Sequence, residues 1–295
     1  MTGIKLIITD LDNTIYNWVD FYGPAFRAML LELVRITGLD EEVLKASFKR
    51  VHQRHHTSEY SFAIEELDVL SDRDRGLSVA ARLQKYGPAI EAFRRKRDET
   101  LKPYPGVAET LTQLRAQGKQ IVGHTDAMKF YAVYRLQRQL RMADLFDGLF
   151  SIRDHGLPPG VVESDVRSQS DPAVYKCSIP VQREFEPTLT KPDPRALNSI
   201  LKEFCASPQN ALYVGDSAQK DLRMAQECGV RDVLAAYGRE YNPRNWQLLV
   251  DITHWTDEDL ARERQLGSQK VKPTYTISEF PELLSVVRDI EGCGI

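Results

Sequence analysis

Short apolar runs alternate with stretches of helical periodicity at the start of the chain and again after residue 103. A run of this kind is typical of a strand buried on both faces of a parallel sheet, and the periodic stretches are typical of the helices that cover it. We place strands at residues 5–9, 119–123, 146–152, 211–214 and 232–236. This alternation predicts an α/β fold with a doubly wound, mostly parallel sheet and helices on both of its faces.

Residues 17–102 show helical periodicity without a strand pattern. We expect the first helix to begin at Gly23-Pro24 and to end at Gly38, and Asp40 can cap the next one. Further helical patterns cover residues 62–70, 77–83 and 90–101. A run of helices between two strand-bearing segments is most simply a separate domain. The sequence therefore predicts a helical domain at 17–102, inserted into an α/β core that consists of residues 1–16 and 103–295.

Two segments of the core interrupt the alternation of strand and helix. Residues 153–190 are irregular and rich in proline, and we expect residues 174–181 to form one strand of a small hairpin. Residues 239–272 are mostly helical and charged. Long connections inside compact domains are uncommon and are often functional or disordered. Two interpretations of the second segment stay open: it packs on the core, or it makes a contact between subunits of a homo-oligomer, as the helical domain also can.

Candidate chemistry lies at the carboxyl ends of the predicted strands. The first strand runs into Asp10, and Asp12 follows two residues later. Open α/β sheets bind their ligands outside these strand ends. Two carboxylates so close together raise each other's pKa unless a cation is nearby, and Mg²⁺ prefers hard oxygen ligands. The alternative is an ordinary turn, because Asp and Asn are common turn residues.

Polar residues also occupy three later boundaries between elements. The hydroxyl of Thr125, after the second strand, can donate to a phosphate oxygen or simply cap the following helix. Lys191 precedes a helix, and its ammonium group can neutralise anionic charge, although most lysines are surface residues. Asp216 follows the strand at 211–214, and Asp221 lies five residues further on. These two carboxylates can face Asp10 and complete an oxygen cage around Mg²⁺, or they can belong to an ordinary capped helix.

Taken in order, these residues resemble the four motifs of the haloacid dehalogenase-like superfamily, in its phosphatase branch. The motifs are DxDxT at Asp10 to Thr14, the strand that ends in Thr125, Lys191 in Lys-Pro-Asp-Pro, and GDxxxxD at Gly215 to Asp221. The resemblance covers residues 1–16 and 103–238, and residues 274–284 are similar to the superfamily's closing strand and helix. It implies a Rossmann-like core with a helical cap, inserted after the first motif, that closes over the site.

The resemblance also implies a function: Mg²⁺-dependent hydrolysis of small phosphomonoesters of the nucleotide or sugar phosphate class. Asp10 would attack phosphorus to form an aspartyl-phosphate, and Asp12 would act as general acid and then as general base. Thr125 and Lys191 would hold phosphate oxygens. Asp221 would bind the metal through water or orient Lys191. The implied metal ligands are Asp10, Asp12 through its backbone carbonyl, Asp216 and Asp221.

Three other functions are compatible with parts of this pattern. A dehalogenase of the same superfamily would use Asp10 but has no need of a second acid, so Asp12 argues against it. A phosphomutase would use all four motifs. A binding or regulatory protein on a retained fold would not need the complete set of site residues.

Composition and charge limit the kinds of partner that we expect for this chain. The chain has 295 residues and a net charge of −3, which gives no general attraction to nucleic acid or to an anionic membrane. No apolar run approaches the roughly 20 residues that span a bilayer, and the first residues show no signal-peptide pattern. The four cysteines form no CxxC pair, which is typical of reduced thiols. We therefore expect a cytoplasmic protein whose partner is a small phosphorylated metabolite.

Overall fold

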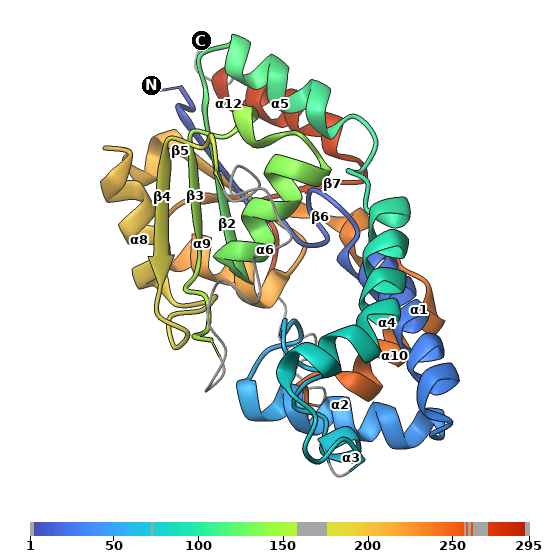
Figure 1. The fold of residues 1–295 in the computed structure, drawn as a ribbon. Coiled ribbons are helices and arrows are strands. Elements are labelled where there is room, and N and C mark those ends of the chain that lie inside the picture. Colours follow the sequence, from blue (N-terminus) through green and yellow to red (C-terminus); the bar gives the residue numbers. More distant parts are fainter. Residues whose placement is uncertain are drawn as a thin grey trace.

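The computed structural model describes residues 3–71, 73–157, 176–256, 258, 261 and 271–292. Within these residues the strands form one sheet in the order β4-β3-β2-β1-β5-β6-β7, and every pairing in it is parallel (Figure 1). The strands are β1 (Leu6–Thr9), β2 (Gln120–Met128), β3 (Gly148–Ile152), β4 (Val181–Phe185), β5 (Ala211–Gly215), β6 (Arg231–Ala235) and β7 (Tyr275–Ile277).

Helices connect the strands and also form a group of their own. The α-helices are α1 (Trp18–Thr37), α2 (Glu41–His55), α3 (Asp68–Ser71), α4 (Val79–Thr100), α5 (Val107–Ala116), α6 (Lys129–Val133), α8 (Pro194–Glu203), α9 (Arg223–Glu227), α10 (Pro243–Ile252) and α12 (Leu283–Gly292). Two π-helical segments are η1 (Tyr134–Gln139) and η5 (Ala218–Leu222). Short 3₁₀ turns are η2 (Ala143–Leu145), η4 (Pro208–Asn210), η6 (Ala236–Arg239) and η7 (Phe280–Glu282).

The sheet is buried on both faces, as the apolar runs predict. In β1, Leu6 and Ile8 belong to one apolar cluster with residues of α8 and α9, whereas Ile7 belongs to another with residues of α5 and α12. This division follows from the alternation of side chains along a strand. The doubly wound parallel sheet is therefore confirmed, and closing strand β7 and helix α12 occur where the resemblance implies them.

The second strand is longer than the sequence predicts. The sequence predicts a strand that ends at Gly123, but β2 continues to Met128 and α6 begins at Lys129. The reason is continued pairing with β3: His124 lies opposite Phe150 and Met128 opposite Ile152, with an irregularity between them. The polar residues at this strand end resemble a loop in sequence, although their backbone still belongs to the sheet.

The predicted hairpin within 153–190 is wrong for the residues that the structure describes. Its first two residues, 174 and 175, lie outside the described part, and the regular strand is β4 (Val181–Phe185). This strand pairs in parallel with β3, from Gly148 opposite Val181 to Ile152 opposite Phe185. The segment 153–190 therefore includes the edge strand of the sheet and is not wholly an addition to it.

The first helix begins five residues earlier than predicted. Asn17 caps α1 at Trp18, because its side-chain Oδ1 accepts the Asp20 N–H at 2.9 Å. Gly23-Pro24 lies inside the helix, and Gly23 is needed for packing: a Cβ atom there would lie 2.8 Å from Cβ of Asn245 in α10. The predicted end at Gly38 and the Asp40 cap of α2 are confirmed.

The other helical expectations in this region are partly wrong. Gly87-Pro88 also lies inside a helix, because the stretches predicted at 77–83 and 90–101 join in α4. Residues 62–70 form mainly turns, with α3 as a single helical turn.

Helix α10, from the segment 239–272, packs against α1 and α2 (Figure 1). The Asn245 side-chain amide donates to Asp20 at 2.9 Å, and Lys49 Nζ donates to the Val250 carbonyl at 3.1 Å. The Trp255 ring lies 6.2 Å from the Trp18 ring. Helices α1–α4 and α10 together form a unit that we call the helical layer. That residues 17–102 form a separate domain that closes over the site stays a prediction.

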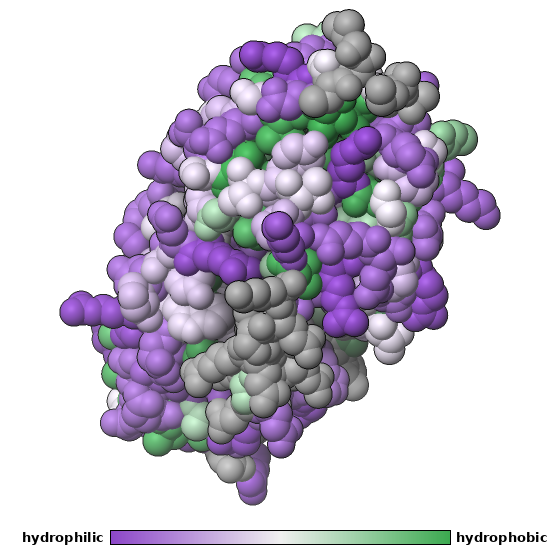
Figure 2. Space-filling model, turned by 180° about the vertical axis from the view of Figure 1, so that it is seen from behind, coloured by the Kyte–Doolittle hydropathy of each residue, from purple (hydrophilic) through white to green (hydrophobic). Residues whose placement is uncertain are grey.

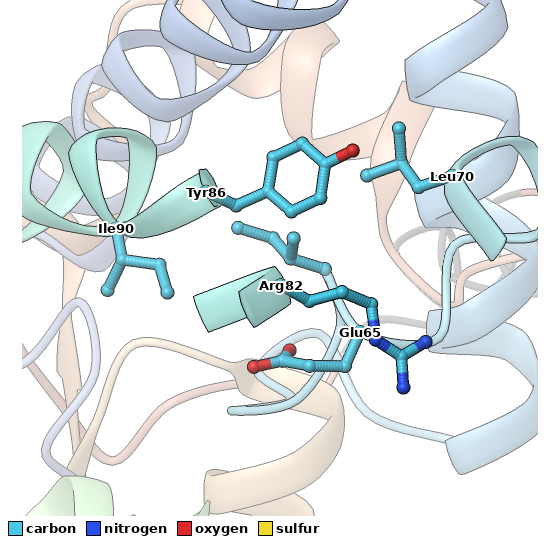
Figure 3. A pocket seen from close by; sticks show the side chains of 6 residues that line it. Glu65, Leu70, Arg82, Tyr86 and Ile90 are labelled. Carbon is cyan, nitrogen blue, oxygen red and sulfur yellow. The ribbon is translucent and has the colours of Figure 1, made fainter. Parts of the chain in front are cut away.

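A pocket lies inside the helical layer (Figure 3). Its lining is Ile64, Glu65, Leu70, Arg82, Tyr86 and Ile90. Burial raises the pKa of Glu65, whose Oε2 has no hydrogen-bond partner. Because none of the predicted site residues lines this pocket, it belongs to the packing of the layer and not to the candidate active site.

The surface of the described residues is largely polar. The molecular face in Figure 2 is mainly hydrophilic, with its apolar area concentrated in the upper half of the view. Large apolar side chains that are exposed among the described residues are Leu31, Val43, Leu77 and Leu157. In the same part of the chain, no helix combines the length and the apolar character that crossing a membrane requires.

Candidate active site

Three neighbouring strands bring the predicted site residues to one edge of the sheet. Asp10 follows β1, Thr125 lies in β2, and Asp216 follows β5. β1 lies between β2 and β5, and its last residue, Thr9, is in register with Gly123 and Val214. The carboxyl ends of parallel strands are the usual ligand site of such sheets. The fold therefore places these motifs side by side, although they are far apart in sequence.

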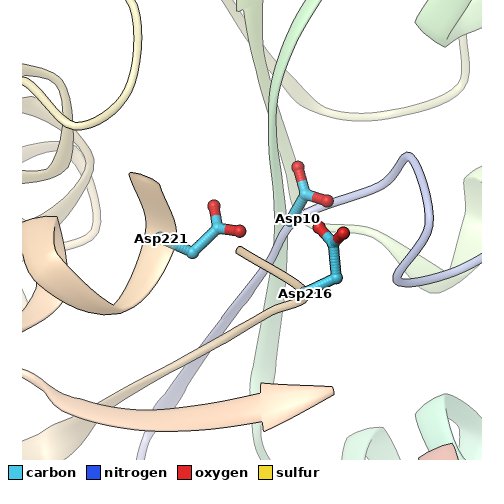
Figure 4. A group of neighbouring side chains, drawn as sticks. All are labelled: Asp10, Asp216 and Asp221. Atoms are coloured by element: carbon cyan, nitrogen blue, oxygen red, sulfur yellow. The ribbon is translucent and has the colours of Figure 1, made fainter. Parts of the chain in front are cut away.

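Asp10, Asp216 and Asp221 form an acidic cluster (Figure 4). Each offers an oxygen atom, and these atoms all lie within 4.8 Å of one another. Burial raises the pKa of Asp10, and limited access of water together with Asp221 raises the pKa of Asp216 to about 7. A divalent cation would remove this cost, because it favours the charged form of each carboxylate. The donor set, all carboxylate oxygen, fits Mg²⁺.

Gly215 allows this cluster to be compact. A Cβ atom at position 215 would lie 2.4 Å from Cγ of Asp221, which is closer than real carbon atoms approach. Any side chain there would push Asp221 away from the strand end. Packing against Asp221 therefore requires the glycine of the GDxxxxD motif in this chain.

Lys191 lies between two members of the acidic cluster. Its Nζ donates to Asp221 Oδ1 at 2.8 Å and to Asp10 Oδ1. Burial disfavours the charged amine, but Asp10 and Asp221 outweigh it and raise the pKa of Lys191. The Lys191 backbone N–H donates to Asp126 Oδ1 at 3.0 Å. Sequence reasoning gave Asp126 no role, and the structure shows that it anchors the backbone of this lysine.

Asp221 is held by three donors. Besides Lys191, the Tyr213 hydroxyl donates to Oδ1 at 3.3 Å, and the Ser217 backbone N–H donates to Oδ2 at 3.0 Å. Tyr213 in turn contacts Nδ1 of the buried His124 at 3.0 Å. Burial and the nearby Lys191 lower the pKa of His124 and so favour its neutral imidazole. This arrangement favours Asp221 as the residue that orients Lys191, one of the two roles that the resemblance implies.

Asp12 and Thr125 lie together, beside the acidic cluster. Thr125 Oγ1 donates to Asp12 Oδ2 at 3.3 Å and also accepts the Ala127 N–H at 3.0 Å. The side chain of Asp12 is not part of the acidic cluster. That its backbone carbonyl binds metal stays a prediction from the resemblance. The Asp10 carboxylate accepts from Thr14 Oγ1 at 3.0 Å. All six predicted site residues thus lie in one region.

Sequence reasoning missed Arg135 and Glu59. Arg135 Nη1 donates to Asp12 Oδ1 at 3.1 Å, and its Nη2 contacts Glu59 Oε1. Both side chains are buried, at 4% and 9% exposed. Arg135 lies in a stretch that reads as an ordinary amphipathic helix, and Glu59 lies in a segment without periodicity. Neither position carried a signal in the sequence.

Comparison with known proteins identifies the family. The family model of haloacid dehalogenase-like hydrolases matches residues 4–229. A glyceraldehyde 3-phosphate phosphatase of Methanopyrus kandleri is 24% identical, over 97% of this chain and 98% of that protein. A phosphoglycolate phosphatase of Pseudomonas putida is 25% identical, over 79% of this chain and 70% of that protein. The chain therefore belongs to the haloacid dehalogenase-like hydrolases.

A solved structure supports the fold. The crystal structure of a 2-haloacid dehalogenase from Pseudomonas syringae superposes with a TM-score of 0.51 at 17% identity, and the match covers 97% of this chain and 99% of that one. At this identity the likeness concerns the fold alone. It agrees with the parallel sheet and its helices described above.

Proposed function

We propose that this protein is a Mg²⁺-dependent phosphatase of small phosphomonoesters that acts through an aspartyl-phosphate on Asp10. The observation that carries the proposal is the contact of Lys191 with both Asp10 and Asp221, beside Asp216. One buried cation among three carboxylates leaves an excess of negative charge. A divalent metal ion is complementary to this excess, and the metal ion together with Lys191 would then attract the anionic phosphoryl group of a substrate.

Each residue has a role that follows from its position. Asp10 Oδ attacks phosphorus, the bond from phosphorus to the ester oxygen breaks, and the departing alcohol takes a proton from Asp12. Asp12 then takes a proton from the water that hydrolyses the aspartyl-phosphate, which regenerates the Asp10 carboxylate and releases phosphate. Lys191 and the Thr125 hydroxyl hold phosphate oxygens.

The metal would be held by Asp10, the backbone carbonyl of Asp12, and Asp216. When bound, it neutralises charge that builds up on the phosphoryl oxygens. Asp221 keeps Lys191 in place, because its oxygens are already engaged by Lys191, Tyr213 and Ser217.

The names of the similar phosphatases suggest a class of substrate. Two of the relatives described above are named for small three-carbon or two-carbon phosphate esters, glyceraldehyde 3-phosphate and phosphoglycolate. We extend this class to the present chain and propose a small phosphorylated metabolite as its substrate. The helical layer is proposed to act as the cap that closes over such a substrate and excludes water.

The test is a phosphate-release screen of the purified chain with small phosphorylated metabolites, including both of these esters, in the presence of Mg²⁺. We expect the wild-type chain to hydrolyse at least one alkyl ester. The Asp10→Asn variant should not hydrolyse that ester. Lack of hydrolysis of every ester, including 4-nitrophenyl phosphate, would contradict the proposed function.

A further inference from the structure

Arg135 joins two carboxylates from different parts of the chain. Asp12 belongs to the loop after β1, and Glu59 lies after α2 in the helical layer. Nη1 of Arg135 donates to Asp12 Oδ1 at 3.1 Å, and Nη2 contacts Glu59. Glu59 also accepts from Trp18 Nε1 at 2.9 Å, which ties its other side to α1. A single buried guanidinium thus connects Asp12 with the helical layer.

Aromatic rings fix the position of this guanidinium. The Arg135 Cζ atom lies 5.0 Å from the centre of the Phe21 ring and 5.8 Å from those of Tyr16 and Tyr131. Rings at this distance attract a cation, and they leave the planar group few other orientations. Burying the charge without its carboxylate partners would be costly. The contact with Asp12 is therefore part of a packed structure and not a passing surface ion pair.

The same contact settles how the Asp12 carboxylate is oriented. Oδ1 accepts from Arg135 at 3.1 Å, and Oδ2 accepts from Thr125 Oγ1 at 3.3 Å. Thr125 is the residue proposed above to hold a phosphate oxygen. Oδ2 is consequently the oxygen on the phosphate side, where the ester oxygen must receive a proton. The charge of Arg135 is already paired with two carboxylates, so we do not assign this residue to binding the phosphate.

We propose that Arg135 is a positioning residue that aims Asp12 Oδ2 at the ester oxygen, with Glu59 holding Arg135 from the helical layer. The inference rests on the proposed function, because it assigns Arg135 a role only in proton transfer by Asp12. Arg135 touches no reacting atom. Its effect is on the geometry of the acid, and general acid catalysis requires hydrogen-bond reach of the atom that is protonated.

The test compares kcat/KM for two esters. One is the best alkyl phosphate from the screen, whose alkoxide must be protonated as it leaves. The other is 4-nitrophenyl phosphate, whose leaving group departs without a proton. For Arg135→Gln we expect kcat/KM to fall at least tenfold more on the alkyl ester than on the aryl ester. Arg138→Gln is the matched control, because it removes the same charge from an exposed position of the same element.

Two further variants keep the result decisive. When Arg135→Gln is added to the Asp12→Asn variant, kcat/KM for the alkyl ester should fall little further. The effects of substituting two residues that act as one unit are not additive. If Arg135→Gln does not fold, the double variant Arg135→Gln/Glu59→Gln removes both buried charges and should show the same difference between the esters.

Each outcome has a defined meaning. Equal losses on both esters would show a purely structural role and overturn the inference, as would no loss on either or an additive loss on the Asp12→Asn background. If the wild-type chain hydrolyses the esters and Arg135→Gln has unchanged kcat/KM, the result refutes this inference and leaves the proposed function intact. A wild-type chain that hydrolyses neither ester refutes the proposed function, and this inference with it.

Discussion

Lys191 Nζ lies 2.8 Å from Oδ1 of Asp221 and also contacts Oδ1 of Asp10. The lysine precedes α8, Asp10 follows β1, and Asp221 lies in η5, so one side chain links three elements at the sheet edge. Buried charges are tolerated when they are paired in this way. The relationship makes Lys191 the residue on which the charge balance of the site depends.

Replacing Lys191 by Gln should reduce kcat/KM by roughly 10²–10³, because it removes a preorganised charge that faces the transferring phosphoryl group. The loss is measured by phosphate release under saturating Mg²⁺. Lys202→Gln is the control, since Lys202 is an exposed lysine of the following helix, α8. Near-normal activity of the Lys191 variant would contradict its assigned role.

Removing divalent metal should abolish activity, and Mg²⁺ should restore it while Ca²⁺ restores it poorly. Ca²⁺ accepts more ligands at longer distances, so it holds nucleophile and phosphate less favourably. Mg²⁺ should also raise the melting temperature of the wild-type chain, because a ligand that binds only the folded state stabilises it. The rise should be smaller for Asp216→Asn. An equal rise in that variant would mean that metal binds elsewhere.

His52 should make the stability of the fold depend on pH. Burial lowers its pKa to about 4 from an ordinary value of 6.5, and its Nδ1 lies 2.6 Å from the Ile252 carbonyl of α10. The unfolded chain therefore binds a proton at a higher pH than the folded chain does. The contribution of neutral, buried His52 to the free energy of unfolding is complete above about pH 6.5. It is lost as the pH falls toward about 4.

Urea unfolding of the wild-type chain at about pH 7.5 and about pH 5 measures this effect. His52 alone should account for a loss of about 2 kcal/mol in the free energy of unfolding between these conditions. His52→Gln should lose less than the wild type over the same interval. The control is His56→Asn, at an exposed position with positive φ that Asn tolerates. An unchanged pH dependence in His52→Gln would contradict the assignment.

The sheet and the strand-end carboxylates could be predicted because their signals are local. The run from Leu6 to Ile8 identifies a buried strand by itself, and Asp10 follows from its place at the strand's end. The rule that parallel strand ends share one edge then brings Asp216 to Asp10 without further information. Lys191, by contrast, carries no local signal and is identified only from its order among the motifs.

Other features depend on contacts that no local pattern records. Gly23 reads as a helix start but lies where α10 packs against α1, and this contact joins residues more than two hundred positions apart. Most residues of strand β4 are half-buried or exposed, so its apolar signal is weak. Arg135 gains its meaning only from Asp12 and Glu59, which the fold places around it.

The central claim is that Asp10 becomes phosphorylated during turnover, and trapping that intermediate tests it most directly. The Asp12→Asn variant is mixed with Mg²⁺ and 4-nitrophenyl phosphate, quenched in acid, digested and analysed by mass spectrometry. Loss of the general base should slow hydrolysis of the intermediate by roughly 10²–10⁴, so the phosphoenzyme should accumulate. We expect one phosphate on the peptide that contains Asp10, and none in Asp10→Asn, which should also lack turnover. Turnover without any phosphoenzyme, a phosphate on another residue, or substantial activity of Asp10→Asn would contradict the account.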